Sequence, residues 1–256
     1  MNMNKILHVA TFAGKIMLES GAETYRVEET ICRICTSFGV EMTDSFVTPT
    51  GIMVSISNNK ETLSLIKRVT SRGVDLNKVD QINNLSRVVQ STSTDINEFY
   101  EQLKEVNEGD RYSLTITLIF SAICAGIFSM LFGGDIKDLL SSALIGGIMK
   151  LMNSKFELLS LNEFFINSIS SALATALAIL LFSLGIASNV DKTVIGSIML
   201  LVPGLAITNA IRDTIAGDYL AGIIRAAEAA LIAVSIAVGT GAILSIWINT
   251  LGGSTI

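Results

Sequence analysis

Four long stretches without a charged residue dominate the second half of this 256-residue chain. They cover residues 112–132, 164–190, 193–211 and 229–256, and each contains at least 19 residues. A helix rises about 1.5 Å per residue, so about 20 apolar residues cross the hydrocarbon core of a bilayer. This half of the chain therefore predicts several membrane-spanning helices.

Charge is concentrated in the other half. Residues 1–111 carry 27 of the 41 charged side chains, whereas half of the whole chain is hydrophobic and its mean hydropathy is +0.57. These values exclude both intrinsic disorder and a single soluble core as a description of the chain. We predict a multi-domain protein, in which a small cytoplasmic α+β domain (1–110) precedes an all-α polytopic membrane bundle of about five transmembrane helices (111–256).

The fifth span and the orientation depend on the basic residues. Residues 139–149 are too short to cross a bilayer alone and would be re-entrant, but 136–152 can cross if Lys137 and Lys150 extend to the interfaces. Because Lys and Arg favour the cytoplasmic side, six basic residues against two place the N-terminal domain in the cytoplasm. Five spans then put the C-terminus outside, and four would put it inside. The six are Lys104, Arg111, Lys150, Lys155, Arg212 and Arg225.

Composition excludes several other classes of function. The net charge of −5 argues against nucleic acid as a partner. Cys32 and Cys35 form a Cys-x-x-Cys spacing without a second pair or a nearby His, so we predict helix packing and neither a metal nor another cofactor. The start of the chain lacks the pattern of a signal peptide, because His8, Lys15 and Glu19 interrupt its apolar residues.

One of the two prolines lies inside the third charge-free stretch, in Val202-Pro203-Gly204. Proline removes a backbone donor, so we expect a broken helix whose free N–H groups attract an anion, as in transporters that bind carboxylates at such breaks. Thr208 and Asn209 follow one turn later and could hydrogen-bond the same substrate. The alternative is a kink that neighbouring side chains repair.

Five of the 14 charged residues in the membrane half come directly after this break. Intramembrane charge marks a functional site by default, although a solvated loop with extended arginines is an equal alternative here. In a proton-coupled protein, the acidic members would carry the proton. The five residues are Arg212, Asp213, Asp218, Arg225 and Glu228.

The first 110 residues show the periodicities of helices and strands. Apolar spacing predicts helices over 4–19 and 24–38, ended by Gly21 and Gly39. Residues 40–57 predict a hairpin, 62–69 a third strand, and 75–89 and 96–106 two more helices.

A charged cluster at the first helix junction consists of Glu19, Glu23, Arg26 and Glu28, and in it Glu23 and Arg26 could pair three residues apart. We consider three interpretations of this cluster: a cytoplasmic gate, a carboxylate pair for acid–base chemistry, and a solvated ion pair. The second would make the chain a membrane-tethered enzyme with a hydrolase-like soluble domain, but no nucleophile or metal set supports it.

The order of several short motifs resembles the threonine/serine exporter family over nearly the whole chain. The motifs are Glu19-Ser20-Gly21-Ala22-Glu23-Thr24-Tyr25-Arg26-Val27-Glu28-Glu29, Thr48-Pro49-Thr50-Gly51, Arg72-Gly73-Val74-Asp75-Leu76, and Val202-Pro203-Gly204 with Asn209-Ala210-Ile211-Arg212-Asp213, Gly217-Asp218-Tyr219, Gly222 and Arg225.

The resemblance implies a cytoplasmic domain, about five spans, and export of threonine and serine or of dicarboxylates such as succinate across the bacterial inner membrane. Single-chain members carry a second membrane half, which is missing here. The chain therefore resembles the larger subunit of a split exporter that needs a smaller membrane subunit, and it could also form a homo-oligomer. We predict a proton-coupled exporter subunit; a membrane-tethered enzyme and a subunit that only supports its partner's pathway are the alternatives.

Overall fold

The computed structural model of the protein describes residues 2–58, 61–71, 73–92, 94–109, 112–156 and 162–251. By its internal contacts the chain divides into two compact units. One contains Met1–Asp110 together with Leu205–Ala227, and the other contains Arg111–Gly204 together with Glu228–Ile256. Arg72, Arg111 and the end of the last predicted span (252–256) lie outside the described residues.

An antiparallel sheet forms one layer of the first unit, with β1 (Met42–Thr48), β2 (Gly51–Asn58) and β3 (Glu61–Arg68) in that order. Side chains alternate between the two faces of a strand, so every second residue of β2 is buried: Ile52, Val54 and Ile56. The hairpin predicted over residues 40–57 and the third strand predicted over 62–69 are both confirmed.

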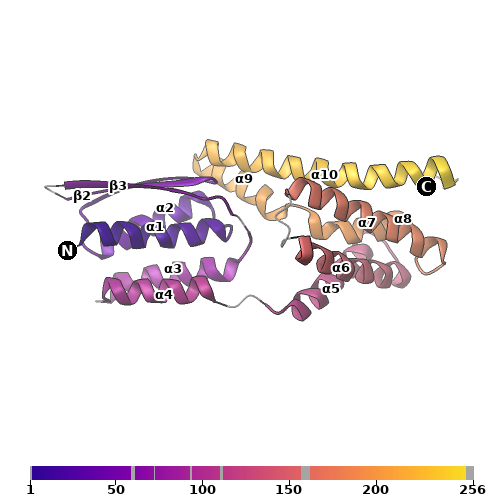
Figure 1. Ribbon diagram of the computed structural model, residues 1–256, viewed down its shortest axis with the longest axis horizontal. Coiled ribbons are helices and arrows are strands. Elements are labelled where there is room, and N and C mark those ends of the chain that lie inside the picture. Colours follow the sequence, from indigo (N-terminus) through magenta and orange to yellow (C-terminus); the bar gives the residue numbers. More distant parts are fainter. Residues whose placement is uncertain are drawn as a thin grey trace. The chain divides into compact units, whose positions relative to one another are not determined.

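Two helical layers cover one face of this sheet (Figure 1). The helices α1 (Met3–Glu19) and α2 (Thr24–Ser37) pack on the strands, and α3 (Leu76–Ser91) and α4 (Ile96–Glu108) pack on α1 and α2. Their apolar faces form one core. All four helices begin and end within a few residues of the predicted bounds.

Two further segments complete the first unit: α9 (Gly204–Ala216) and the start of α10 (Tyr219–Leu251). The turn between them requires Gly217, whose φ of +97° suits glycine. Gly222 then lets α10 pack directly on α9, because a Cβ atom there would overlap the Thr214 hydroxyl and come within 3.0 Å of the Ala210 carbonyl oxygen.

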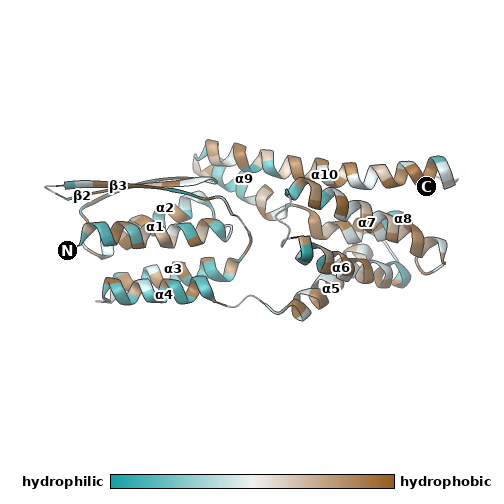
Figure 2. Cartoon of the chain, viewed as in Figure 1, coloured by the Kyte–Doolittle hydropathy of each residue, from teal (hydrophilic) through white to brown (hydrophobic). Residues whose placement is uncertain are grey.

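The second unit is helical in its described residues. It contains α5 (Leu114–Leu131), α6 (Ile136–Phe156), α7 (Glu163–Ser183), α8 (Val190–Ile198), the 3₁₀ turn η2 (Met199–Leu201) and the remainder of α10. Ile145 and Met149 of α6 pack with Ala174 and Ala178 of α7 at its core. Figure 2 shows these helices to be mainly hydrophobic, whereas α3 and α4 carry hydrophilic faces.

Three described helices are long and apolar enough to cross a membrane: α5, α7 and α10. A fourth span results if α8 with η2 and α9 count as one bent span. α6 is a continuous helix of 21 residues but is not among these. The count of five spans therefore stays a prediction.

The predicted helix break is confirmed. The helical turn η2 ends at Leu201, Val202 and Pro203 are not helical, and α9 begins at Gly204. The two helical segments are bent by 55° relative to each other. The proline is the physical cause, because it cannot donate the backbone hydrogen bond that would continue the helix.

Candidate functional site

The loop between α1 and α2 meets α9 and the start of α10, although nearly 190 positions separate them in the sequence. Asn209 Nδ2 donates to the Gly21 carbonyl oxygen at 2.9 Å, and Arg225 Nη2 donates to the Ala22 carbonyl oxygen at 2.7 Å. The chain turns at Gly21 with a φ of +89°, which a residue with a side chain rarely adopts. Two motifs that the sequence analysis treated separately therefore form one site.

A carboxylate from α9 caps the first turn of α2. The N-cap residue Glu23 makes no capping bond with its own side chain, and the Thr24 backbone N–H instead donates to Asp213 Oδ1 at 3.2 Å. The Thr24 hydroxyl donates to Asp218 Oδ2 at 3.3 Å. Helix N-termini attract anions, so the acidic residues are electrostatically favoured there. The sequence analysis predicted an anion at the N-terminus of α9 and did not predict one at the N-terminus of α2.

Two sets of ion pairs tie the same elements together. Arg225 Nε lies 2.9 Å from Asp213 Oδ2, and both side chains are almost fully buried. Glu23 contacts Arg212 at 2.6 Å and Arg26 at 3.1 Å, which confirms the predicted pairing with Arg26. The Arg212 side chain remains 55% exposed, so this cation is the accessible member of the site.

Glu23 is held in its ionised form. Burial disfavours the charge, but hydrogen bonds from its own backbone N–H and from Arg212, together with the Arg26 charge, outweigh burial and place the pKa of Glu23 below the usual glutamate value. The pair with Arg212 is therefore present at neutral pH.

One acceptor in the site has no partner. Asn209 is 1% exposed, and its Oδ1 atom makes no hydrogen bond within the described residues, while its Nδ2 atom is used by Gly21. A buried acceptor without a donor costs free energy, so this position favours a ligand that brings an N–H or O–H group.

The other predicted residues fall in different places. Thr208 is exposed, so it does not share the buried environment of Asn209. Glu19 pairs with Lys15 at 3.3 Å. Pro203 and Gly204 lie at the helix break, and they belong with Glu228 to the second unit.

Glu28 lies beside this site; the sequence placed it in the charged cluster with Glu23 and Arg26 but assigned it no role of its own. Its carboxylate accepts the Val47 backbone N–H at 2.7 Å and thereby joins α2 to β1. Burial and the charges of Asp218 and Asp213 raise the pKa of Glu28, against the effect of the Val47 hydrogen bond. Its position in the first motif, one helical turn after Thr24, was the feature of the sequence that could have indicated its place beside the site.

The two cysteines of α2 are unpaired, and Cys35 is fully buried. Burial raises the pKa of the Cys35 thiol to about 12, so it carries no thiolate at neutral pH. Across the described residues, no group of three or more His, Cys, Asp or Glu side chains could hold a metal ion.

Several apolar helices, one of them broken at a proline, and a cluster of charges close after the break are features of a polytopic membrane transport protein. The sequence matches the family described as "Putative threonine/serine exporter" over residues 8–247. The chain belongs to this family.

Two curated relatives are similar over nearly their whole length. The "Probable succinate transporter subunit YjjP" of Klebsiella aerogenes is 21% identical over 236 residues, which cover 90% of each chain. The protein of the same name in Escherichia coli is 22% identical over 239 residues, which cover 91% of each chain. No solved structure matches the chain significantly. Both relatives are named as transporter subunits, which supports transport over the hydrolase alternative.

Proposed function

We propose that the chain is one subunit of a proton-coupled secondary exporter in the bacterial inner membrane. Its substrates are small carboxylate-bearing metabolites, either threonine and serine or dicarboxylates such as succinate. The substrate class is supported by the family and by the names of the relatives. The observation that carries the proposal is the site in which Glu23, Arg212 and Asp213 meet beside the unpaired Asn209 oxygen.

In this proposal Arg212 exchanges partners when the substrate binds. A substrate carboxylate replaces Glu23 on the exposed guanidinium, because Arg recognises carboxylates through paired hydrogen bonds. The hydroxyl or ammonium group of threonine or serine donates to Asn209 Oδ1, and a dicarboxylate such as succinate donates to it in the monoprotonated form, through the O–H of its carboxylic acid group. Breaking the Glu23–Arg212 pair separates the α1–α2 loop from α9, so Glu23 acts as a cytoplasmic gate together with Arg26 and Glu19. The break at Pro203 and Gly204 and the hydroxyl of Thr208 contribute the remaining substrate contacts.

Asp213, Asp218 and Glu228 are the proposed proton carriers. Protonation of Asp213 would weaken its attraction to Arg225, since a neutral carboxyl group no longer contributes a charge–charge interaction with the cation. The contact between Arg225 and the Ala22 carbonyl oxygen connects this change to the α1–α2 loop. Proton binding and the opening of the gate are thereby coupled through one pair of side chains.

The domain boundary, the orientation and the partner are part of the same proposal. Residues 1–110 form the cytoplasmic α+β domain, and residues 111–256 form five spans that end outside the cell. Apolar side chains on α5 remain exposed, with Ile119 at 52%, Phe120 at 62% and Ile127 at 58%. Such a face fits lipid or another membrane protein. A smaller membrane subunit supplies the second half of the exporter.

Efflux from cells tests the proposal. Cells that produce the chain and its small partner are loaded with threonine or succinate, and efflux is measured with each subunit present and absent. Asn209→Ala and Arg212→Gln should each reduce efflux at least about tenfold, because each removes a substrate hydrogen bond, one of them to a charge. Ile215→Ala, at an 81% exposed position of α9, is the matched control and should export normally. Normal efflux in both site variants would contradict the assignment.

A further inference from the structure

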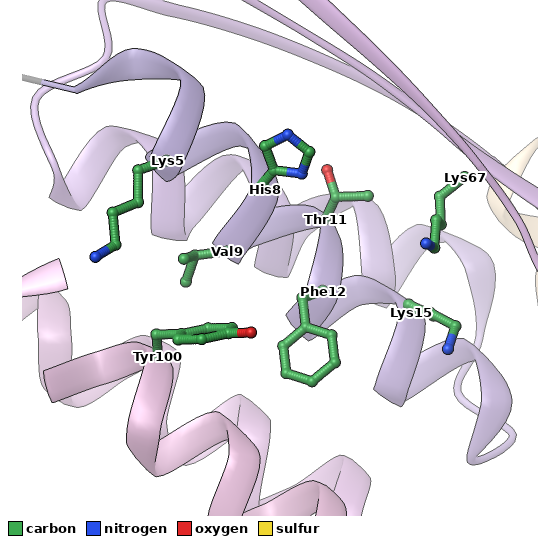
Figure 3. A pocket seen from close by; sticks show the side chains of 8 residues that line it. All are labelled: Lys5, His8, Val9, Thr11, Phe12, Lys15, Lys67 and Tyr100. Atoms are coloured by element: carbon green, nitrogen blue, oxygen red, sulfur yellow. The ribbon is translucent and has the colours of Figure 1, made fainter. Parts of the chain in front are cut away.

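A cavity separate from the site around Asn209 lies in the first unit, between α1, α4 and β3, and it has a volume of about 370 Å³. This is within the range of small-molecule sites. Among the described residues, four basic side chains line it and no acidic side chain does (Figure 3): Lys5, His8, Lys15 and Lys67. The chain as a whole carries a net charge of −5, so this concentration of positive charge does not follow from composition.

Two acidic residues at the end of α1 and before α4 already have partners, and Glu61 of β3 lines a neighbouring pocket together with His8. Glu19 pairs with Lys15 at 3.3 Å, and Asp95 caps α4 by accepting the Asn97 backbone N–H at 2.8 Å. Within the described residues, neither Lys67 nor His8 forms an ion pair or a side-chain hydrogen bond. The positive charge of Lys67 is therefore not neutralised by the protein, and a bound anion would be attracted to it.

The cavity also has an apolar wall. Val9, Phe12 and Tyr100 line it, and the rings of Phe12 and Tyr100 lie 5.7 Å apart at a tilt of 59°. Figure 3 shows Lys67 extending from its strand toward α1, and the rings of Phe12 and Tyr100 lying next to each other between α1 and α4. Cations beside an aromatic wall suit a ligand that has both anionic groups and an apolar part.

We propose that this cavity binds a small organic polyanion, with two or more carboxylate or phosphate charges and a short apolar part. The site is distinct from the one around Asn209, since the two share no residue. A regulatory role, in which a metabolite in the cytoplasm binds here and adjusts export, rests on the proposed function. Binding itself does not depend on it.

Lys67 and Arg68 provide a matched pair of variants for the test. They are neighbours in β3, both are exposed, and the alternation of strand side chains turns them to opposite faces of the sheet. Only Lys67 lines the cavity. The purified full-length chain in nanodiscs of zwitterionic lipid is titrated calorimetrically with citrate, inorganic phosphate and ATP, none of which is a proposed transport substrate.

At least one probe should bind, and Lys67→Gln should weaken it about tenfold, because charged hydrogen bonds are the strong ones. Arg68→Gln and Asn209→Ala should leave its affinity unchanged, which also separates this site from the transport site. A carboxylate probe that binds better than phosphate and ATP identifies a metabolite acid, and the reverse order identifies a phosphate ester. The proposal is overturned if no probe binds, or if Arg68→Gln weakens binding as much as Lys67→Gln.

Lysine footprinting of the unmodified protein gives a second readout that does not depend on the folding of a variant. Acetylation of Lys67 and Lys15 should slow at least about fivefold when the probe is bound, because a bound anion shields the amines. Lys78, which donates to the Asn107 carbonyl oxygen away from the cavity, is the internal control. Equal protection of Lys78 and Lys67, or protection of neither, would contradict a site in this cavity.

Discussion

Two helices of this protein, α2 and α8, begin without a side-chain cap of their own, and each receives a buried aspartate from a distant segment. At α8, in the second unit, the aspartate is Asp138 of α6. At α2, in the first unit, it is Asp213 of α9. Both carboxylates are 0% exposed, yet their surroundings differ.

Asp138 is held by neutral donors. Its carboxylate accepts the backbone N–H groups of Ser188 and Asn189, both at 2.8 Å, and also the side chains of Asn189 and Thr193. These contacts join the first turn of α6 to the start of α8. Asp138 therefore stabilises the fold.

Asp213 is held mainly by a charge. It has one backbone donor, Thr24, and an ion pair with Arg225, and the exposed Arg212 and the unpaired Asn209 oxygen lie on the same helix. A competing anion can take the cation of an ion pair, whereas the neutral donors around Asp138 offer no cation to such an anion. The comparison teaches that burial of an acidic residue does not identify a functional site, and that the nature of its partners does.

Replacing Asp138 should have the largest effect on stability. In Asp138→Asn one carboxylate oxygen is replaced by an NH₂ group, which cannot accept the hydrogen bonds that this oxygen now accepts. The free energy of unfolding should therefore fall by about 3 kcal/mol. Thermal unfolding of the purified chain in detergent measures the loss. Asp135→Asn, at the exposed neighbour that also accepts from Ser188, should cost under about 1 kcal/mol. Equal losses in the two variants would show that burial of the hydrogen bonds is unimportant.

Two threonines of α2 differ in their hydrogen bonds: the hydroxyl of Thr24 donates to Asp218, and the hydroxyl of Thr30 has no partner among the described residues. Thr24→Val removes the donor to Asp218 and should cost about 1 kcal/mol, whereas Thr30→Val removes a buried hydroxyl without a partner and should leave stability unchanged or raise it. Both residues are at most 1% exposed, so the pair is closely matched. A larger loss for Thr30→Val in the same unfolding assay would contradict the contacts described for Thr24.

Replacing Glu28 should have the smallest effect on stability, and this effect should appear as a change in how the free energy of unfolding depends on pH. Its pKa is raised in the folded state, so the folded protein binds more protons than the unfolded chain between the usual glutamate pKa and the raised one. Its contribution to stability therefore falls as pH rises through that window. In Glu28→Gln this fall should disappear, while the amide oxygen still accepts from Val47. Unfolding midpoints between pH 4 and 8 test this, with Glu98→Gln as an exposed control; an unchanged profile in Glu28→Gln would contradict it.

Much of the fold followed from local patterns. Periodicity identified the elements of the first 108 residues, and Pro203 located the helix break, because both are determined by residues close together in sequence. The pairing of Thr24 with Asp213 could not be derived in this way, since the contact spans 189 positions. Asp138 was overlooked for the same reason: beside Lys137 it looks like an interfacial charge, and its donors come from the start of α8.

Efflux per folded molecule in Asp213→Asn and Asp138→Asn tests the central claim most directly. Cells that carry the chain and its small partner are assayed for export, and the folded chain in their membranes is quantified in parallel. The account predicts that Asp138→Asn lowers the amount of folded protein while each remaining molecule exports normally. Asp213→Asn should export almost nothing per molecule. Export by Asp213→Asn at the wild-type rate per molecule would contradict the assignment of the transport site to this part of the chain.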